Sequence, residues 1–205
     1  MIQKLLVTIT QRRTRCCTFC SLLTYQRHIS KLSTMAQPQP QPKLIVFDLD
    51  YTLWPFWVDT HVSPPFKMGS NGKVYDADKQ HVKYYPDVPD ILRKLHQEDF
   101  KLGIASRTSA THEANDLTRL FNWDQFFHYR QIYPGCKITH FKKLHNQSGI
   151  PYEDMIFFDD EHRNIVDVSS LGVTCMFVPD GVSWQSFKEG IELFQRRRTK
   201  KGTSS

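Results

Sequence analysis

The sequence predicts an α/β protein with a three-layer, doubly wound parallel sheet, a small β-hairpin flap and no large cap domain. Short apolar runs such as 44–47 and 155–158 are continuous, which is typical of strands covered on both faces. Amphipathic stretches with helical spacing separate these runs. Strands and helices that alternate in this way form parallel sheets with helices on both faces.

The individual elements follow from the same patterns. Strands are expected at 43–47, 102–105, 126–132, 155–158 and 173–178. Apolar positions at helical spacing predict helices over 88–95, 111–120, 138–149, 165–172 and 184–194.

Capping residues indicate where several of these helices begin and end. Asp87, with Pro89 in the first turn, is typical of a helix start, and Thr111 is predicted to cap the next helix. Gly149 and Gly172 follow the last apolar positions of two later helices and predict their ends.

The segment between the first strand and the first helix has no helical pattern. Two short runs, 66–68 and 73–75, flank the turn 69–72, which predicts a β-hairpin. From Ser106 to Lys137 there are roughly thirty residues, which one helix and one strand use. Because neither gap has room for a cap domain, we expect an open site that suits a bulky substrate.

The charge distribution argues against a nucleic-acid surface. The net charge is +6, but 12 of the 27 Lys and Arg residues lie in 1–47 or 196–205, which contain no acid. All 21 acids therefore lie in 48–195 with the other 15 bases. Basic ends of this kind are usually solvated tails, so we expect no nucleic-acid partner. Without a run of 18 apolar residues, no membrane partner is expected either.

The chain divides into three parts. We expect a basic leader with a Gln/Pro spacer over 1–42, one domain over 43–195, and a basic tail over 196–205, with both ends disordered. Residues 1–34 fit either a mitochondrial transit peptide or sequence upstream of a start at Met35. An odd number of cysteines, five, favours free thiols. We expect a cytoplasmic monomer, or a mitochondrial one if 1–34 are a transit peptide.

Charged and hydroxyl side chains gather at the predicted strand ends. They are Asp48 and Asp50 after the first strand, Ser106 and Arg107 after the second, Lys137 at the start of the helix after the third, and Asp159 and Asp160 after the fourth. Carboxyl ends of parallel strands meet at one edge, where ligands bind. One Asp at a strand end often only caps a turn. Two pairs of carboxylates indicate a site for Mg²⁺, which prefers oxygen ligands.

Electrostatic repulsion between carboxylates and phosphate explains why carboxylates and cations occur together. A phosphate dianion about 4 Å from a carboxylate is repelled by roughly 8 kcal/mol at an effective dielectric constant of about 20. A divalent cation between them reverses the local field. Lys137 and Arg107 would add positive charge on the phosphate side. The acids would thus hold the metal, and the metal and cations would hold the phosphate.

Three groups besides an aspartate could attack phosphorus: water, Ser106 and Cys136. Water remains one alternative. Ser106 has no neighbouring His in sequence to act as a base, which argues against a hydrolase triad. Cys136 beside Lys137 suggests a cysteine phosphatase, but 134–137 is short for an anion-binding loop. An aspartate that forms an aspartyl phosphate fits best.

These residues resemble the four motifs of the haloacid dehalogenase superfamily over about 43–195. The motifs are an apolar strand followed by Asp-x-Asp-x-Thr (48–52), a Ser ending the second strand (Ser106), a Lys near a helix start (Lys137), and a paired acid with an Asn four residues on (159–164). The single Asp-x-Asp-x-Thr motif is short, whereas the ordered set at strand ends is specific.

The resemblance implies a role for each residue. Asp48 attacks phosphorus, and Asp50 protonates the leaving oxygen and then takes a proton from water. Leu49, Ser106, Arg107 and Lys137 bind the substrate. The ligands of Mg²⁺ are Asp48, the backbone carbonyl of Asp50, and Asp160. Asp159 would position Lys137 or a water on the metal, and the choice between Asp159 and Asp160 as ligand stays open.

The resemblance also implies the substrate class. We expect a magnesium-dependent phosphomonoester hydrolase that acts on protein phosphotyrosine or on protein sugar phosphates such as fructosamine 6-phosphate. The alternatives are a small-molecule sugar phosphatase and a non-catalytic binding module on the same fold. Trp54, Phe56 and Trp57 follow the nucleophile, and they either pack on the substrate or pack the hairpin onto the body.

Overall fold

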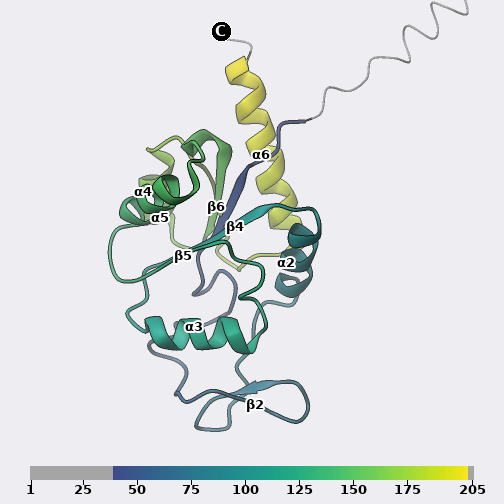
Figure 1. Cartoon of the computed structure of the whole chain (residues 1–205), viewed down its shortest axis with the longest axis vertical. Coiled ribbons are helices and arrows are strands. Elements are labelled where there is room, and N and C mark those ends of the chain that lie inside the picture. The colour runs from purple at the N-terminus through teal and green to yellow at the C-terminus, as the bar shows by residue number, and fades with distance from the viewer. Residues whose placement is uncertain (1–38, 203–205) are drawn as a thin grey trace, which may run out of the picture. The chain divides into compact units, whose positions relative to one another are not determined.

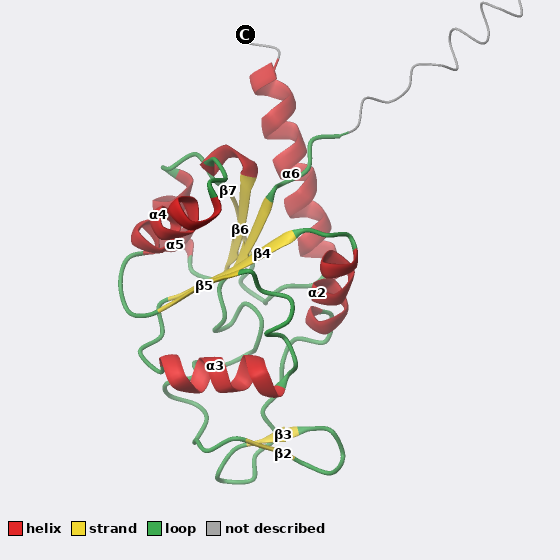
Figure 2. Cartoon of the chain, viewed as in Figure 1, coloured by secondary structure: helices red, strands yellow, loops and turns green. Residues whose placement is uncertain are grey.

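The structure is a computed structural model that describes residues 39–202. A five-stranded sheet runs through its centre in the order β5-β4-β1-β6-β7, and every neighbouring pair is parallel (Figures 1 and 2). The strands are β1 (Leu44–Phe47), β4 (Lys101–Ser106), β5 (Tyr129–Ile132), β6 (Met155–Asp159) and β7 (Thr174–Phe177). The α-helices are α2 (Val88–Gln97), α3 (Thr111–Leu120), α4 (Lys137–Ser148), α5 (His162–Ser169) and α6 (Trp184–Gly202), and a 3₁₀ turn covers Tyr152–Asp154.

Helices cover both faces of the sheet, as predicted. Ile45 and Phe47 of β1 belong to a core cluster that also contains apolar residues of α2, α3 and α6. Leu44 and Val46 point into a second cluster with residues of α4 and α5. All four side chains are completely buried, because a strand with two covered faces alternates between two cores. The sheet therefore forms the middle of three layers.

Strand order decides where the site lies. The chain leaves β1, passes through β4 and β5 on one side, and returns to β6 on the other side of β1. The chain thus changes the side on which it adds strands next to β1, and the carboxyl ends of β4, β1 and β6 lie side by side. Ligands bind at such a switch point in open α/β sheets.

The small hairpin is also confirmed. Strands β2 (Lys67–Met68) and β3 (Val74–Tyr75) are antiparallel and lie apart from the main sheet, beyond α3 (Figure 2). Between Ser106 and Lys137 the chain forms only α3 and β5. No larger insertion covers the strand ends within residues 39–202.

Asp87 is the N-cap residue of α2 with Pro89 in the first turn, as predicted, whereas the predicted cap at Thr111 is wrong. Asp87 makes no side-chain hydrogen bond to α2; its Oδ2 accepts one from the backbone N–H of Trp184, 3.0 Å away, where α6 begins. Thr111 is the first helical residue of α3, and its hydroxyl donates to the carbonyl of Ile132. Tertiary contacts to distant elements have replaced the local hydrogen bonds that capping propensity predicts. Gly149 does end α4, with φ 68°.

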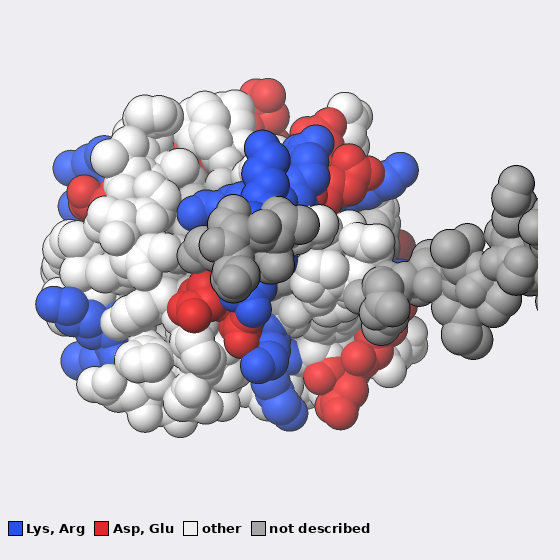
Figure 3. Space-filling view, turned by 90° about the horizontal axis from the view of Figure 1, so that it is seen from above, with Lys and Arg blue, Asp and Glu red and all other residues white. Residues whose placement is uncertain are grey.

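The predicted tail is corrected as well. Residues 196–202 continue α6 instead of forming a disordered tail, because basic side chains there find acceptors on the body. Arg197 donates to the carbonyl of Val173 at 3.1 Å, and Arg198 pairs with Asp154 at 3.0 Å. Lys and Arg side chains lie around this end of the helix (Figure 3), which also suits the helix dipole. The leader over 1–38 lies outside the described residues, and 39–42 have no regular structure.

In the described part of the chain, no helix is both long enough and apolar enough to cross a membrane.

A close helix–sheet contact gives a stability prediction. A Cβ at Gly190 would lie 2.7 Å from Cε1 of Phe158, whose ring stacks on Phe47 and Phe187 and has no room to move. We expect Gly190→Ala to lower the free energy of unfolding by about 1–3 kcal/mol, although alanine favours helices. Chemical denaturation checks this against Glu192→Ala at an exposed position of α6. An unchanged or higher stability of Gly190→Ala would contradict the packing argument.

Candidate active site

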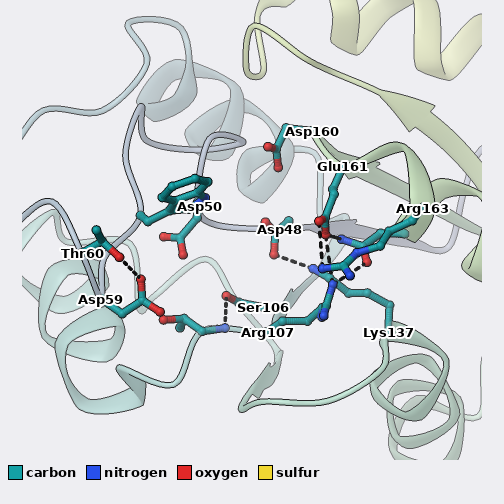
Figure 4. Close-up of a pocket in the computed structure, with 13 residues that line it drawn as sticks. Asp48, Asp50, Asp59, Thr60, Ser106, Arg107, Lys137, Asp160, Glu161 and Arg163 are labelled. Carbon is teal, nitrogen blue, oxygen red and sulfur yellow. Dashed lines mark hydrogen bonds and ion pairs between the residues drawn. The ribbon is translucent and has the colours of Figure 1, made fainter.

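A cavity of about 510 Å³ lies at the carboxyl ends of β4, β1 and β6, where the sequence predicts the site (Figure 4). Every charged or hydroxyl residue predicted for the site lines it, except Asp159. Its basic side chains gather on one side. Arg107, Lys137 and Arg163 lie on one side with Glu161, and Asp50 and Asp59 lie on the other.

Register places the predicted nucleophile between two strand ends. Phe47 pairs with Ile104 of β4 and with Phe158 of β6, so the next residue, Asp48, lies beside Ala105 and Asp159. The backbone N–H of Asp48 donates to the carbonyl of Phe158 at 3.0 Å and extends the sheet by one hydrogen bond. Asp48 is therefore fixed by backbone pairing.

Lys137 is a buried cation between these strand ends. Its Nζ lies 2.5 Å from Oδ1 of Asp48 and 3.1 Å from Oδ2 of Asp159, and it donates to the carbonyl of Ala105. Only 1% of the residue is exposed. Burial lowers the pKa of Lys137, but the attraction of the two carboxylates outweighs burial and raises that pKa above its usual value. Lys137 thus carries its charge in the folded protein.

The paired acids after β6 have different surroundings. Asp159 is completely buried, and both of its carboxylate oxygens accept hydrogen bonds from Nδ2 of Asn164 at 3.1 Å. Its Oδ1 also accepts from the backbone N–H of Glu161 at 2.7 Å, and its Oδ2 faces Lys137. Asp160 lines the cavity instead, and its backbone N–H donates to the hydroxyl of Thr52. This arrangement favours Asp159 as the partner of Lys137 and Asp160 as the metal ligand.

Asp50 is held by the segment that follows it. Its Oδ1 accepts hydrogen bonds from Nε1 of Trp54 at 2.7 Å and from the backbone N–H of Val58 at 3.1 Å. Burial raises the pKa of Asp50 to about 6, and those two hydrogen bonds oppose the shift. A carboxyl group with this pKa can carry a proton near neutral pH, as a general acid must.

The carboxylates form a cluster that fits a divalent cation. One oxygen each of Asp48, Asp159 and Asp160 lies within 4.8 Å of the others. Burial raises the pKa of Asp48 well above its usual value and that of Asp160 to about 6, and negative neighbours add to both shifts. When all three carboxylates are ionised, they carry more negative charge than the single cation Lys137 compensates. Oxygen-only ligands with uncompensated charge suit Mg²⁺.

The other predicted substrate-binding residues lie differently. Ser106 and Arg107 line the cavity, and Arg107 is held by Glu161 at 3.0 Å and by the carbonyl of Gly135 at 3.0 Å. The side chain of Leu49 is completely buried in the core, so the prediction that it binds substrate is limited to its backbone.

Burial decides which of the aromatic residues Trp54, Phe56 and Trp57 pack in the core and which can contact a substrate. Trp54 is completely buried and stacks on Phe56 and Trp123, so Trp54 and Phe56 are core residues. Trp57 is 51% exposed and lines the cavity. Only one of the three aromatic residues can therefore contact a substrate.

Several cavity residues were missed by sequence reasoning. They are Asp59, Thr60, Thr108, Glu161 and Arg163. Each lies within nine residues of a predicted motif, but polar residues near a motif carry no periodic signal that separates cavity positions from surface positions.

The family of the chain follows from comparison with known proteins. The model of the family described as Acid Phosphatase matches residues 40–197. The chain belongs to the acid phosphatase family. It is 54% identical to magnesium-dependent phosphatase 1 of Homo sapiens over 158 residues. This alignment covers 77% of this chain and 90% of that protein. The chain is 44% identical over 144 residues to a HAD-like hydrolase superfamily protein of Schizosaccharomyces pombe, covering 65% and 83%.

Solved structures agree on the fold of this acid phosphatase family member. A HAD-superfamily hydrolase from Geobacter sulfurreducens matches with a TM-score of 0.50 and 13% identity, over 66% of this chain and 89% of that one. A structure from Clostridium difficile, described as a phosphatase candidate, matches with a TM-score of 0.53 and 17% identity, over 73% and 91%. The predicted fold of the haloacid dehalogenase superfamily and the predicted phosphatase activity are thus confirmed.

The carboxylate cluster predicts a pH-dependent effect of Mg²⁺ on stability. A folded-state pKa of about 6 for Asp50 and Asp160 lies above the ordinary value of about 3.9, so without metal the free energy of unfolding falls as pH rises from about 4 to 6. Mg²⁺ binds ionised carboxylates, and at a hundred times its Kd it adds about 2.7 kcal/mol. We expect a larger rise in Tm with Mg²⁺ at pH 7.5 than at pH 5.

Thermal unfolding with and without Mg²⁺ measures this effect. Asp160→Asn should lose most of the rise in Tm at pH 7.5, whereas Asp78→Asn, at an exposed turn after β3, should keep it. Equal rises at both pH values would contradict a site of raised-pKa carboxylates.

Proposed function

We propose that the chain is a magnesium-dependent phosphomonoester hydrolase that acts through an aspartyl phosphate on Asp48. The observation that carries this proposal is the contact of Asp48 with the buried cation Lys137, at the cavity edge and beside Asp160. A carboxylate held next to a fixed positive charge can approach a phosphate that it would otherwise repel.

Two residues would perform the bond changes. In the first step an oxygen of Asp48 forms a bond to phosphorus while the bond to the leaving oxygen breaks, and Asp50 gives its proton to that oxygen. In the second step a water oxygen bonds to phosphorus while the bond from phosphorus to Asp48 breaks. Asp50 takes a proton from that water and is ready for the next cycle. The raised pKa of Asp50 supports this alternation.

The remaining residues would bind and orient the phosphoryl group. Hydrogen-bond donors to the phosphoryl oxygens would come from the strand ends. They are Lys137, Ser106, Arg107 and the backbone of Leu49. Asp48, the backbone carbonyl of Asp50, and Asp160 would hold Mg²⁺. When bound, the ion would neutralise the negative charge of the phosphate and of the carboxylates.

For the substrate, we propose protein-borne phosphate esters: phosphotyrosine or sugar-phosphate adducts such as fructosamine 6-phosphate. The open cavity supports this, because neither the hairpin nor any larger insertion in residues 39–202 closes it. Enzymes with this fold act on many different substrates, so the fold does not indicate the substrate class. The support comes from the open site. We propose that the chain acts as a monomer in the cytoplasm, or in mitochondria if 1–34 are cleaved.

The test is a phosphate-release assay on the full chain with and without Mg²⁺. We expect Mg²⁺-dependent release, with kcat/KM at least about tenfold higher for phosphotyrosine peptides or glycated-protein phosphates than for glucose 6-phosphate. Equal or higher kcat/KM on free sugar phosphates would make it a small-molecule sugar phosphatase. A folded chain that releases no phosphate from any ester would be a binding module.

A further inference from the structure

His140 is a completely buried histidine of α4 that the proposed reaction does not use. Both of its ring nitrogens face backbone carbonyl groups of the loop between β5 and α4. Nδ1 lies 2.9 Å from the oxygen of Cys136, and Nε2 lies 2.9 Å from the oxygen of Tyr133. The imidazole also stacks on the ring of Tyr133, with ring centres 4.2 Å apart. A carbonyl oxygen only accepts, so each contact is a hydrogen bond only when the nitrogen carries a proton.

The two carbonyl groups differ in their other donors. The oxygen of Cys136 also accepts from the backbone N–H of Thr139 at 2.9 Å, whereas within residues 39–202 the oxygen of Tyr133 has no donor besides Nε2 of His140. Burial lowers the pKa of His140, and the charge of Lys137 adds to this shift, while the facing carbonyl groups oppose it. The ring therefore has one proton at neutral pH. It is expected on Nε2, beside the acceptor that has no other donor.

The loop that begins at Tyr133 contains an anchor for Arg107. Gly135 follows two residues later, and its carbonyl oxygen accepts from Nε of Arg107 at 3.0 Å. Only Pro134 separates the two residues, and its ring fixes its own φ, so a turn of the Tyr133 carbonyl changes the direction of the Gly135 carbonyl as well. The contact of His140 with Tyr133 thus holds the acceptor that orients one side of the Arg107 guanidinium.

The other cation of the cavity depends less on this loop. Lys137 begins α4 directly after the loop, but its Nζ has three partners of its own: Asp48, Asp159 and the carbonyl of Ala105. The side chain of Arg107 is 33% exposed, and its Nε has a single acceptor, on the loop. A displaced loop should therefore change the position of Arg107 more than that of Lys137.

We propose that His140 is a positioning residue that sets the place of Arg107 at the phosphate by donating from Nε2 to the carbonyl of Tyr133. The inference rests on the proposed phosphatase function, in which Arg107 binds the phosphoryl oxygens. An acceptor that loses its donor beside a buried side chain turns toward another donor or toward water. The carbonyl of Gly135 then turns away from Arg107, and the guanidinium no longer faces the phosphate.

Three substitutions at position 140 separate the hydrogen bond from the packing. His140→Gln places an amide N–H near the position of Nε2, His140→Asn places one near Nδ1, and His140→Phe keeps an aromatic ring without a donor. With Mg²⁺ and 4-nitrophenyl phosphate at pH 7.5, His140→Asn and His140→Phe should raise KM by about fivefold or more, and His140→Gln by less than about twofold. Partial unfolding alone would lower kcat and leave KM unchanged. Equal KM values in the Gln and Asn variants would overturn the inference, also where the Phe variant does not fold.

His145 offers a matched control at the other end of α4. Its Nδ1 lies 2.8 Å from the carbonyl oxygen of Ile150, and its ring contacts that of Tyr152 at 4.7 Å. It thus makes the same two kinds of contact as His140 but does not line the cavity. His145→Phe should leave KM unchanged even where it lowers Tm. A rise in KM as large as that of His140→Phe would assign the effect to α4 as a whole and overturn the role of His140.

A double variant tests the route through Arg107. Arg107→Met should raise KM by itself, and adding His140→Phe should raise it further by less than about twofold, because both changes remove the same contact with the phosphate. Increases in KM that multiply would show that His140 acts elsewhere and would overturn the inference.

The position of the proton is measured directly by ¹⁵N NMR of the imidazole rings in the full chain. At pH 7.5 we expect the proton of His140 on Nε2, and a proton on Nδ1 would overturn the inference. Failure of the proposed function gives a different result. If the unmodified chain releases no phosphate from 4-nitrophenyl phosphate or from any other ester, that function fails and the role of His140 fails with it. An active chain whose Gln and Asn variants share one KM rejects the role of His140 alone.

Discussion

Asp48→Asn is expected to abolish phosphate release, with kcat reduced on the order of 10⁴-fold or more, while the protein remains folded. An amide of nearly the same size cannot form the bond to phosphorus. Fold loss is not expected, because the backbone N–H of residue 48 still pairs with Phe158 and Lys137 keeps Asp159 and the carbonyl of Ala105 as partners.

Three measurements check this prediction together. Phosphate release gives the activity, circular dichroism and Tm report the fold, and acid quenching with labelled substrate traps a phosphoenzyme. We expect label on the unmodified protein and none on Asp48→Asn. Asp50→Asn should slow turnover yet still accept label from esters with good leaving groups, because it lacks only the proton donor. Activity above about a hundredth of the original in Asp48→Asn would exclude an aspartyl phosphate on this residue.

Lys137→Met is expected to cost both stability and activity. The substitution leaves Asp48 and Asp159 buried without the cation that lies 2.5 Å and 3.1 Å from them. Breaking a buried pair by removing one partner typically lowers the free energy of unfolding by about 3–5 kcal/mol. Loss of a fixed cation at the phosphate site should lower kcat/KM by about 10²-fold or more.

The pH dependence and a double variant identify the cause. Asp48 has a raised folded-state pKa, so it takes up a proton as pH falls, and the stability lost by Lys137→Met should be smaller at pH 5 than at pH 7.5. Adding Asp159→Asn to Lys137→Met should recover about 1–3 kcal/mol, because it removes one unpaired charge, but it should recover no activity. Urea unfolding at both pH values measures these terms. An equal loss at both pH values would mean that lost packing, and not charge, destabilises the variant.

Much of the site was predictable because strand ends are visible in sequence. Asp48, Ser106 and Asp160 each follow an apolar run, and parallel strands bring their carboxyl ends to one edge whatever the details of packing. Strand order, however, was not predictable from periodicity. The order that places β1 between β4 and β6 is what puts Asp48 beside Asp159 and gives Lys137 two carboxylates to contact.

Predictions that rested on local propensity were less reliable. Asp87 does occupy the N-cap position of α2, but its side chain accepts from Trp184 of α6, and Thr111 bonds β5 from inside α3. The basic stretch over 196–202 continues α6 because Val173 and Asp154 supply acceptors. Trp54 and Trp57 are chemically identical, and only packing made one a core residue and the other part of the cavity.

The sequence by itself determined the alternation of helices and strands, the two covered faces of the sheet, and the residue types that meet at its edge. These features depend on apolar periodicity and on chain direction, which are local properties. The tertiary structure alone decided that Asp159 faces Lys137 while Asp160 lines the cavity. Adjacent residues have the same propensity, and only the surrounding elements decide which of them is buried, paired or open to a ligand.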